Sequence, residues 1–128
     1  MPTLSTISLC AAGVIGGVVS CVHGYLADKL MVRPVRRHLD ADPRMSGPVK
    51  WLIPPLLHFS TFNWLIGGVA LIVAATLPSR EARVAVGVLV GSSYAYGTAI
   101  NFLANRGRHP GAWLYGAAVA LIVVGILA

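Results

Sequence analysis

The residues of this chain best suited to chemistry are three histidines, His23, His58 and His109, which lie in or beside long uncharged stretches. Two neutral imidazoles on different helices can supply both axial nitrogens to the iron of haem b. Neutral imidazole also binds zinc, copper and non-haem iron. The sequence therefore predicts a site on His23 and His58 that holds haem b or a transition metal. In the metal case, His109 or Asp28 would be the third ligand.

Cations near the membrane surface would complete a haem site, because haem propionates are anionic. The candidates are Arg36, Arg106 and Arg108. The stretch 106–110 also precedes an expected helix, whose free N–H groups favour an anion. A phospholipid headgroup is the expected occupant of that position. A membrane enzyme acting on a lipid-like substrate is a further alternative, and Tyr94 and His58 are equally good candidates for its base.

A polar stripe runs along the uncharged stretch 84–105. Its members recur at helical spacing and are Tyr94, Thr98, Asn101 and Asn105. In an oligomeric transporter or channel these uncharged side chains would line a path for a small neutral or anionic solute. In a packing role they would hydrogen-bond between helices instead. The spacing alone leaves both interpretations open.

The elements that position these residues follow from the distribution of charge. Of 128 residues, 56% are hydrophobic and only 11% are charged, which excludes a soluble enzyme, a disordered tail and a disulfide scaffold. The charges leave four free stretches, each about as long as the roughly 20 helical residues that span a bilayer. The apolar runs show no period-2 alternation, so strands are not expected. We predict one all-α transmembrane domain over residues 1–128, a four-transmembrane-helix bundle. Its helices lie at about 4–31, 51–77, 83–105 and 110–127, with a basic loop at 32–50.

Orientation follows from the ten basic residues. Loop 32–50 and the residues flanking it carry six Lys and Arg, the third loop carries two, and the second loop carries two. The positive-inside rule places the first and third loops in the cytoplasm and both termini outside an inner membrane. Three of the four histidines then gather near the cytoplasmic face. The net charge of +6 arises from basic residues concentrated on the cytoplasmic side, where they would attract anionic lipid headgroups. Nothing in the pattern suggests binding to nucleic acid.

The first uncharged stretch is expected to remain as a helix, because it has no basic n-region and is too long for a signal peptide. Cys10 and Cys21 lie 11 residues apart on this helix, about 16 Å, which is too far for a disulfide. We expect an accessory or structural subunit of a membrane assembly, either a homo-oligomer or part of a larger complex. The histidine-bound cofactor, the transporter and the lipid enzyme are the alternatives.

Overall fold

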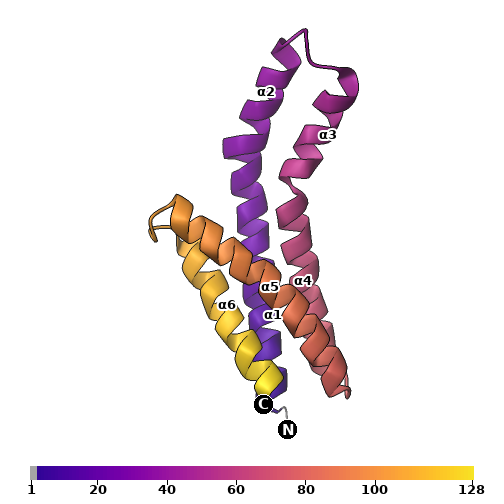
Figure 1. Cartoon of the computed structure of the whole chain (residues 1–128), viewed down its shortest axis with the longest axis vertical. Coiled ribbons are helices and arrows are strands. Elements are labelled where there is room, and N and C mark those ends of the chain that lie inside the picture. Colours follow the sequence, from indigo (N-terminus) through magenta and orange to yellow (C-terminus); the bar gives the residue numbers. More distant parts are fainter. Residues whose placement is uncertain (1–2) are drawn as a thin grey trace.

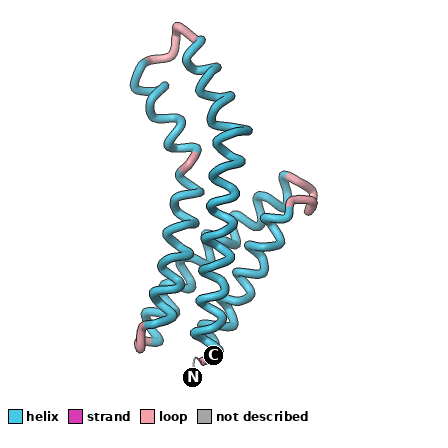
Figure 2. The backbone as a smooth tube through the Cα atoms, turned by 180° about the vertical axis from the view of Figure 1, so that it is seen from behind, coloured by secondary structure: helices cyan, strands magenta, loops and turns pink. Residues whose placement is uncertain are grey.

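The chain folds as an all-α protein in the computed structural model, which describes residues 3–128 (Figures 1 and 2). The helical segments are α1 (Leu4–Ala27), the π-helical turn η1 (Asp28–Val32), α2 (Arg33–Ala41), α3 (Gly47–Leu57), α4 (Phe59–Thr76), α5 (Arg80–Ala104) and α6 (Pro110–Leu127). They form four rods, because η1 joins α1 to α2 and a single residue separates α3 from α4. The expectation of an all-α fold is confirmed.

Three of the four rods are long and apolar enough to cross a membrane: Leu4–Ala41, Gly47–Thr76 and Pro110–Leu127. The fourth, α5, has 25 residues but is less apolar than the others. The apolar helices are consistent with membrane insertion, and the transmembrane expectation is supported for three helices rather than four. The first rod has 38 residues, or about 57 Å, which is nearly twice the hydrocarbon thickness of a bilayer.

The basic segment 32–50 is mostly helical, and this differs from the expected loop. Only Asp42 to Ser46 lie outside the helices. Pro34 does not end the first rod, because the wide turn η1 precedes it and the Arg33 N–H reaches the carbonyl of Asp28 five residues back. The Arg33 guanidinium also contacts the Asp28 carboxylate at 2.7 Å. Pro48 sits in the first turn of α3, where a missing N–H costs little.

The prolines Pro54 and Pro55 lie inside a helix, because the second rod begins at Gly47 rather than near the expected residue 51. These prolines therefore remove two N–H donors from its interior. The helix breaks just after them at His58, whose ψ is −5° and whose N–H is shared between the Pro54 and Pro55 carbonyls at 3.3 and 3.1 Å. This break separates α3 from α4.

Close packing of α1 on α4 holds the first two rods together. A Cβ added at Gly13 would lie 2.6 Å from the Gly68 carbonyl oxygen, so the backbones touch. Gly16 lies directly beneath the hydroxyl of Tyr94 from α5, and Gly125 of α6 packs on Leu9. Small residues thus let the helices approach, as expected for membrane helices. Gly17, in contrast, has open space beside it.

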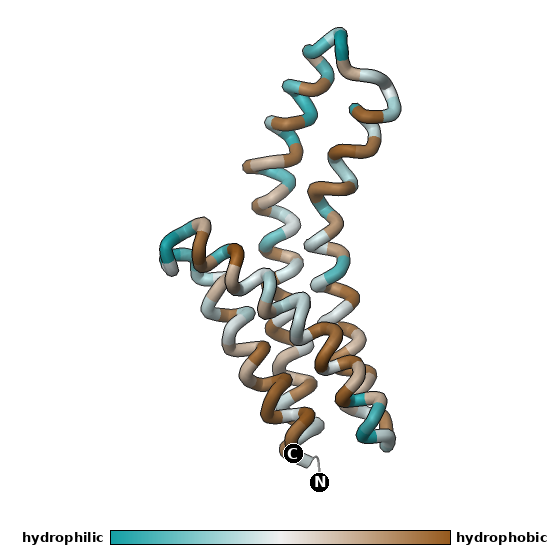
Figure 3. Tube along the Cα trace, viewed as in Figure 1, coloured by the Kyte–Doolittle hydropathy of each residue, from teal (hydrophilic) through white to brown (hydrophobic). Residues whose placement is uncertain are grey.

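The two hairpins of the fold differ in length. The termini and the α4–α5 turn lie at one end of the molecule, while α2 and α3 extend past the α5–α6 turn at the other end (Figure 1). Hydrophobic residues are most frequent in the lower part of the molecule, whereas hydrophilic residues gather on α2 and at the turns (Figure 3). The α1–α3 side of the molecule therefore rises above the α5–α6 hairpin.

Candidate functional site

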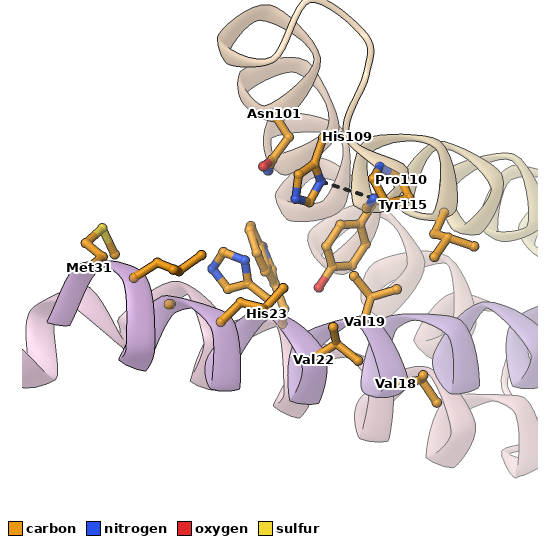
Figure 4. A pocket seen from close by; sticks show the side chains of 15 residues that line it. Val18, Val19, Val22, His23, Met31, Asn101, His109, Pro110 and Tyr115 are labelled. Carbon is orange, nitrogen blue, oxygen red and sulfur yellow. Dashed lines mark hydrogen bonds between the residues drawn. The ribbon is translucent and has the colours of Figure 1, made fainter. Parts of the chain in front are cut away.

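A cavity of about 350 Å³ lies where the upper part of α1 meets the start of α6 (Figure 4). Most of its lining is aliphatic and follows α1 and η1 over residues 18–31, a length of about 20 Å. Trp64 of α4 and Tyr115 of α6 add aromatic surface. The side chains in the lining that carry polar groups are few, namely His23, Asn101, His109, Tyr115 with its hydroxyl and Trp64 with its indole N–H.

His23 reaches the cavity from α1 and is positioned by an aromatic contact. Its ring meets the edge of Trp64 with the ring centroids 5.0 Å apart. Among residues 3–128, no side chain or carbonyl hydrogen-bonds to its ring nitrogens. The side chain is half-buried. His23 therefore presents an imidazole that can bond to a molecule in the cavity.

His109 has one ring nitrogen already occupied. It is the N-cap of α6, and its Nδ1 accepts the Gly111 N–H at 3.1 Å (dashed in Figure 4). A nitrogen that accepts a hydrogen bond carries no proton, so the neutral ring carries its proton on Nε2. His109 is thus a hydrogen-bond donor at Nε2 while its cap is intact.

Asn101 is held by its own helix, and Tyr115 is held by side chains of the neighbouring helices. The Asn101 side-chain NH₂ group donates to the Gly97 carbonyl at 2.8 Å. The side-chain oxygen of Asn101 can therefore still accept a hydrogen bond. The Tyr115 hydroxyl lies 3.2 Å from the Ser20 hydroxyl. The Tyr115 ring packs at 4.8 Å on both Trp64 and Tyr94. Of these packed rings, Trp64 and Tyr115 line the cavity, and Tyr94 supports them from behind.

The structure brings His109 to His23, whereas sequence reasoning paired His23 with His58. His58 does not line the cavity. It occupies the break between α3 and α4, where its Nε2 lies 3.9 Å from the Asp28 carboxylate. The Asp28 carboxylate therefore lies between Arg33 of its own rod and His58 of the second rod.

The expected metal site is not assembled. Within residues 3–128 no group of three or more His, Cys, Asp or Glu side chains could hold a metal ion. His109 could offer Nδ1 only by giving up the cap of α6. Of the expected haem cations, Arg36 lines a separate hollow near Trp51 and Pro54. Arg106 and Arg108 are exposed in the turn that leads into His109.

The polar stripe on α5 is satisfied mainly within its own helix. Thr98, Asn101 and Asn105 each donate to the backbone carbonyl four residues earlier, at 2.9, 2.8 and 3.1 Å. Tyr94 is fully buried, and its hydroxyl donates to the Trp64 carbonyl of α4 at 2.9 Å. Only Asn101 of the four lines the cavity. A continuous path along the stripe therefore finds no support.

Sequence reasoning missed Trp64 and the aliphatic groove along η1. Trp64 lies in the middle of a charge-free stretch, where an indole suits packing as well as a site. Leu30 and Met31 follow the first charges, so their place beside a cavity depended on the helix continuing past Asp28. A single tryptophan in the middle of this stretch was the one feature of the sequence that could have indicated the cavity.

The chain matches no known protein family, and neither curated proteins nor solved structures resemble it at a significant level. The interpretation of the cavity therefore rests on its own residues.

Proposed function

We propose that this protein is a membrane accessory protein that holds a lipid-like amphiphile in the cavity between α1 and α6. The observation that carries the proposal is that His23 on one wall and Asn101 and His109 on the other line the same mostly apolar cavity (Figure 4). Ligand pockets of a few hundred Å³ commonly combine apolar walls with a few polar groups that fix orientation.

The chemistry of the lining indicates which part of the ligand lies where. The apolar chain would follow Val18, Val22, Leu26 and Leu30 along α1 and η1. The polar head would meet the donor at His109 Nε2 and the imidazole of His23. Arg106 and Arg108 carry positive charge in the adjoining turn. An acceptor-rich or anionic headgroup, such as that of a phospholipid, matches this arrangement.

A first test is the removal of the imidazole of His23. We expect His23→Ala to lower the amount of co-purifying amphiphile about tenfold, since a lost buried hydrogen bond is worth about 1 kcal/mol and lost ring contacts add to it. The measurement is lipid mass spectrometry on protein purified in mild detergent, together with an absorption spectrum. His38→Ala is the matched control, because His38 is exposed on α2.

Each outcome of this test decides between readings of the cavity. An amphiphile retained equally by the wild type, His23→Ala and His38→Ala would contradict the proposed site. A Soret band that is present in the wild type and lost in His23→Ala would show that the cavity binds haem rather than a lipid-like amphiphile. A colourless wild-type protein with an amphiphile that depends on His23 would support the proposal.

We also propose that the α2–α3 turn and the α5–α6 turn face the cytoplasm, because most basic residues lie at that end. A cysteine at Ser46, in a chain lacking Cys10 and Cys21, should resist an impermeant thiol reagent in intact cells. A cysteine at Ser79 should react. Both serines are exposed, so accessibility differs only by the side of the membrane. The reverse labelling pattern would invert the orientation.

A further inference from the structure

The cavity between α1 and α6 has no charge on its walls. Among residues 3–128, no Lys, Arg, Asp or Glu side chain belongs to its lining. Arg106 and Arg108 lie in the adjoining turn, where both are exposed. A charged group that enters such a cavity loses water and gains no counter-charge, which costs several kcal/mol. The inside of the cavity therefore favours a ligand whose polar head is uncharged.

Hydrogen-bond donors lie on two facing walls of this cavity (Figure 4). On one wall, His23 has no bonding partner on either ring nitrogen among residues 3–128, and its neutral ring carries one N–H. On the other wall, His109 carries its proton on Nε2, because Nδ1 accepts the Gly111 N–H at 3.1 Å. Asn101 beside it keeps a second N–H after donating to the Gly97 carbonyl. A ligand with an acceptor at each end of its head can bond to both walls.

The aromatic part of the lining supplies flat surface. The Ser20 hydroxyl donates its one proton to the Gly16 carbonyl at 2.7 Å, so the contact of 3.2 Å between Ser20 and Tyr115 uses the proton of Tyr115. Tyr115 therefore has no proton left for the cavity, and what it adds is mainly its ring. The rings of Trp64 and Tyr115 pack with centroids 4.8 Å apart, and both are almost fully buried. Aromatic side chains of this kind favour a flat, conjugated ligand.

We infer that the amphiphile of the proposed function, on which this inference rests, is a para-quinone with an apolar tail. Such a head is flat and uncharged, and its two carbonyl oxygens point in opposite directions and only accept hydrogen bonds. One oxygen faces His23, and the other faces His109 and Asn101. The ring lies against Trp64 and Tyr115, and the tail follows the aliphatic groove along α1 and η1. A phospholipid head, in contrast, would bring a charged phosphate into this cavity.

Titration of the detergent-purified protein with a decyl-substituted para-benzoquinone tests this inference. Quinones quench tryptophan fluorescence on contact. The chain has three tryptophans, and Trp51→Phe with Trp113→Phe leaves Trp64 as the reporter, because the other two are exposed and do not line the cavity. We expect saturable quenching. Decylbenzene has the same tail and a flat ring without carbonyls, so it should compete at least about tenfold more weakly, the scale of two lost hydrogen bonds.

Two variants then remove one donor from each wall. His23→Ala takes away the first, and His109→Ser takes away the second while serine still caps the start of α6. Each should raise the Kd of the quinone about fivefold, the scale of one hydrogen bond. The double variant should raise it about twenty-fivefold, because the two donors serve different carbonyls. His38→Ala, on the exposed part of α2, should leave the Kd unchanged.

The outcomes separate this inference from the proposed function. Quenching that does not saturate, equal competition by decylbenzene, or a Kd that neither histidine variant changes would each overturn the quinone inference. Lipid mass spectrometry on the same preparations then tests the broader proposal. An amphiphile that depends on His23 but is not displaced by the quinone would contradict the quinone and leave the proposed function standing. If neither amphiphile nor quinone binding depends on His23, both are wrong.

Discussion

Replacing Val22 by Trp should empty the cavity between α1 and α6. Val22 lines this cavity, yet its side chain is 54% exposed, so the larger indole can enter the cavity without distorting the core. An indole that fills the path of the apolar chain should reduce retained amphiphile by more than about tenfold. Lipid mass spectrometry of the purified protein measures the loss, with the elution profile as a check on folding.

Val14→Trp is the matched control for this experiment. Val14 lies on the same helix with 55% exposure, and it does not line the cavity. Retention should therefore stay at the wild-type level in Val14→Trp. If both variants lose the amphiphile, the bound molecule lies along the outside of α1 rather than in the cavity. If neither loses it, the cavity is not its site.

Gly16→Ala should cause a large loss of stability for the addition of one methyl group. The added Cβ would overlap the hydroxyl of Tyr94, which is completely buried and donates to the Trp64 carbonyl. The ring cannot move without breaking that hydrogen bond and its contact with Tyr115. Overpacking of this kind costs about 2 kcal/mol. Thermal unfolding in detergent should show a lower midpoint.

Gly17→Ala serves as its control at the next position. A Cβ at Gly17 meets nothing within 4 Å, and alanine is the better helix former by up to about 1 kcal/mol. Its unfolding midpoint should equal or exceed that of the wild type. A midpoint for Gly16→Ala as high as that of Gly17→Ala would show that Tyr94 does not pack as described.

The sequence predicts the helical rods well because charge and hydropathy determine them locally. The expected helix 110–127 coincides with α6, and the expected helix 83–105 differs from α5 by three residues at its start and one at its end. The basic segment was harder, because proline and charge are typical of loops. There the π-helical turn η1 and the pair Asp28–Arg33 keep Pro34 within a helix, and neither feature is apparent from composition.

The candidate site could be predicted only in part. The sequence predicted that His23, His58 and His109 gather at one level of the bundle; His23 and His109 line one cavity, whereas His58 does not. The helix face on which His58 lies depends on where Pro54 and Pro55 interrupt the second rod. Since the break falls at His58 itself, helical spacing from either side could not give its direction. The direction in which a side chain points after such a helix break is determined by tertiary contacts, which the sequence pattern does not give.

The unequal hairpins also have a consequence for the surrounding bilayer. With 18 residues, α6 is about 27 Å long, slightly less than a typical hydrocarbon core, whereas the first rod still exposes the apolar side chains of Leu30 and Met31 in η1, beyond the end of α1. Such a hydrophobic mismatch on one side of a protein thins the adjacent leaflet. The cavity lies beside the upper end of α6, at this step. If the protein is inserted as proposed, we expect a membrane-dissolved molecule to reach the cavity by lateral diffusion, without passing through water.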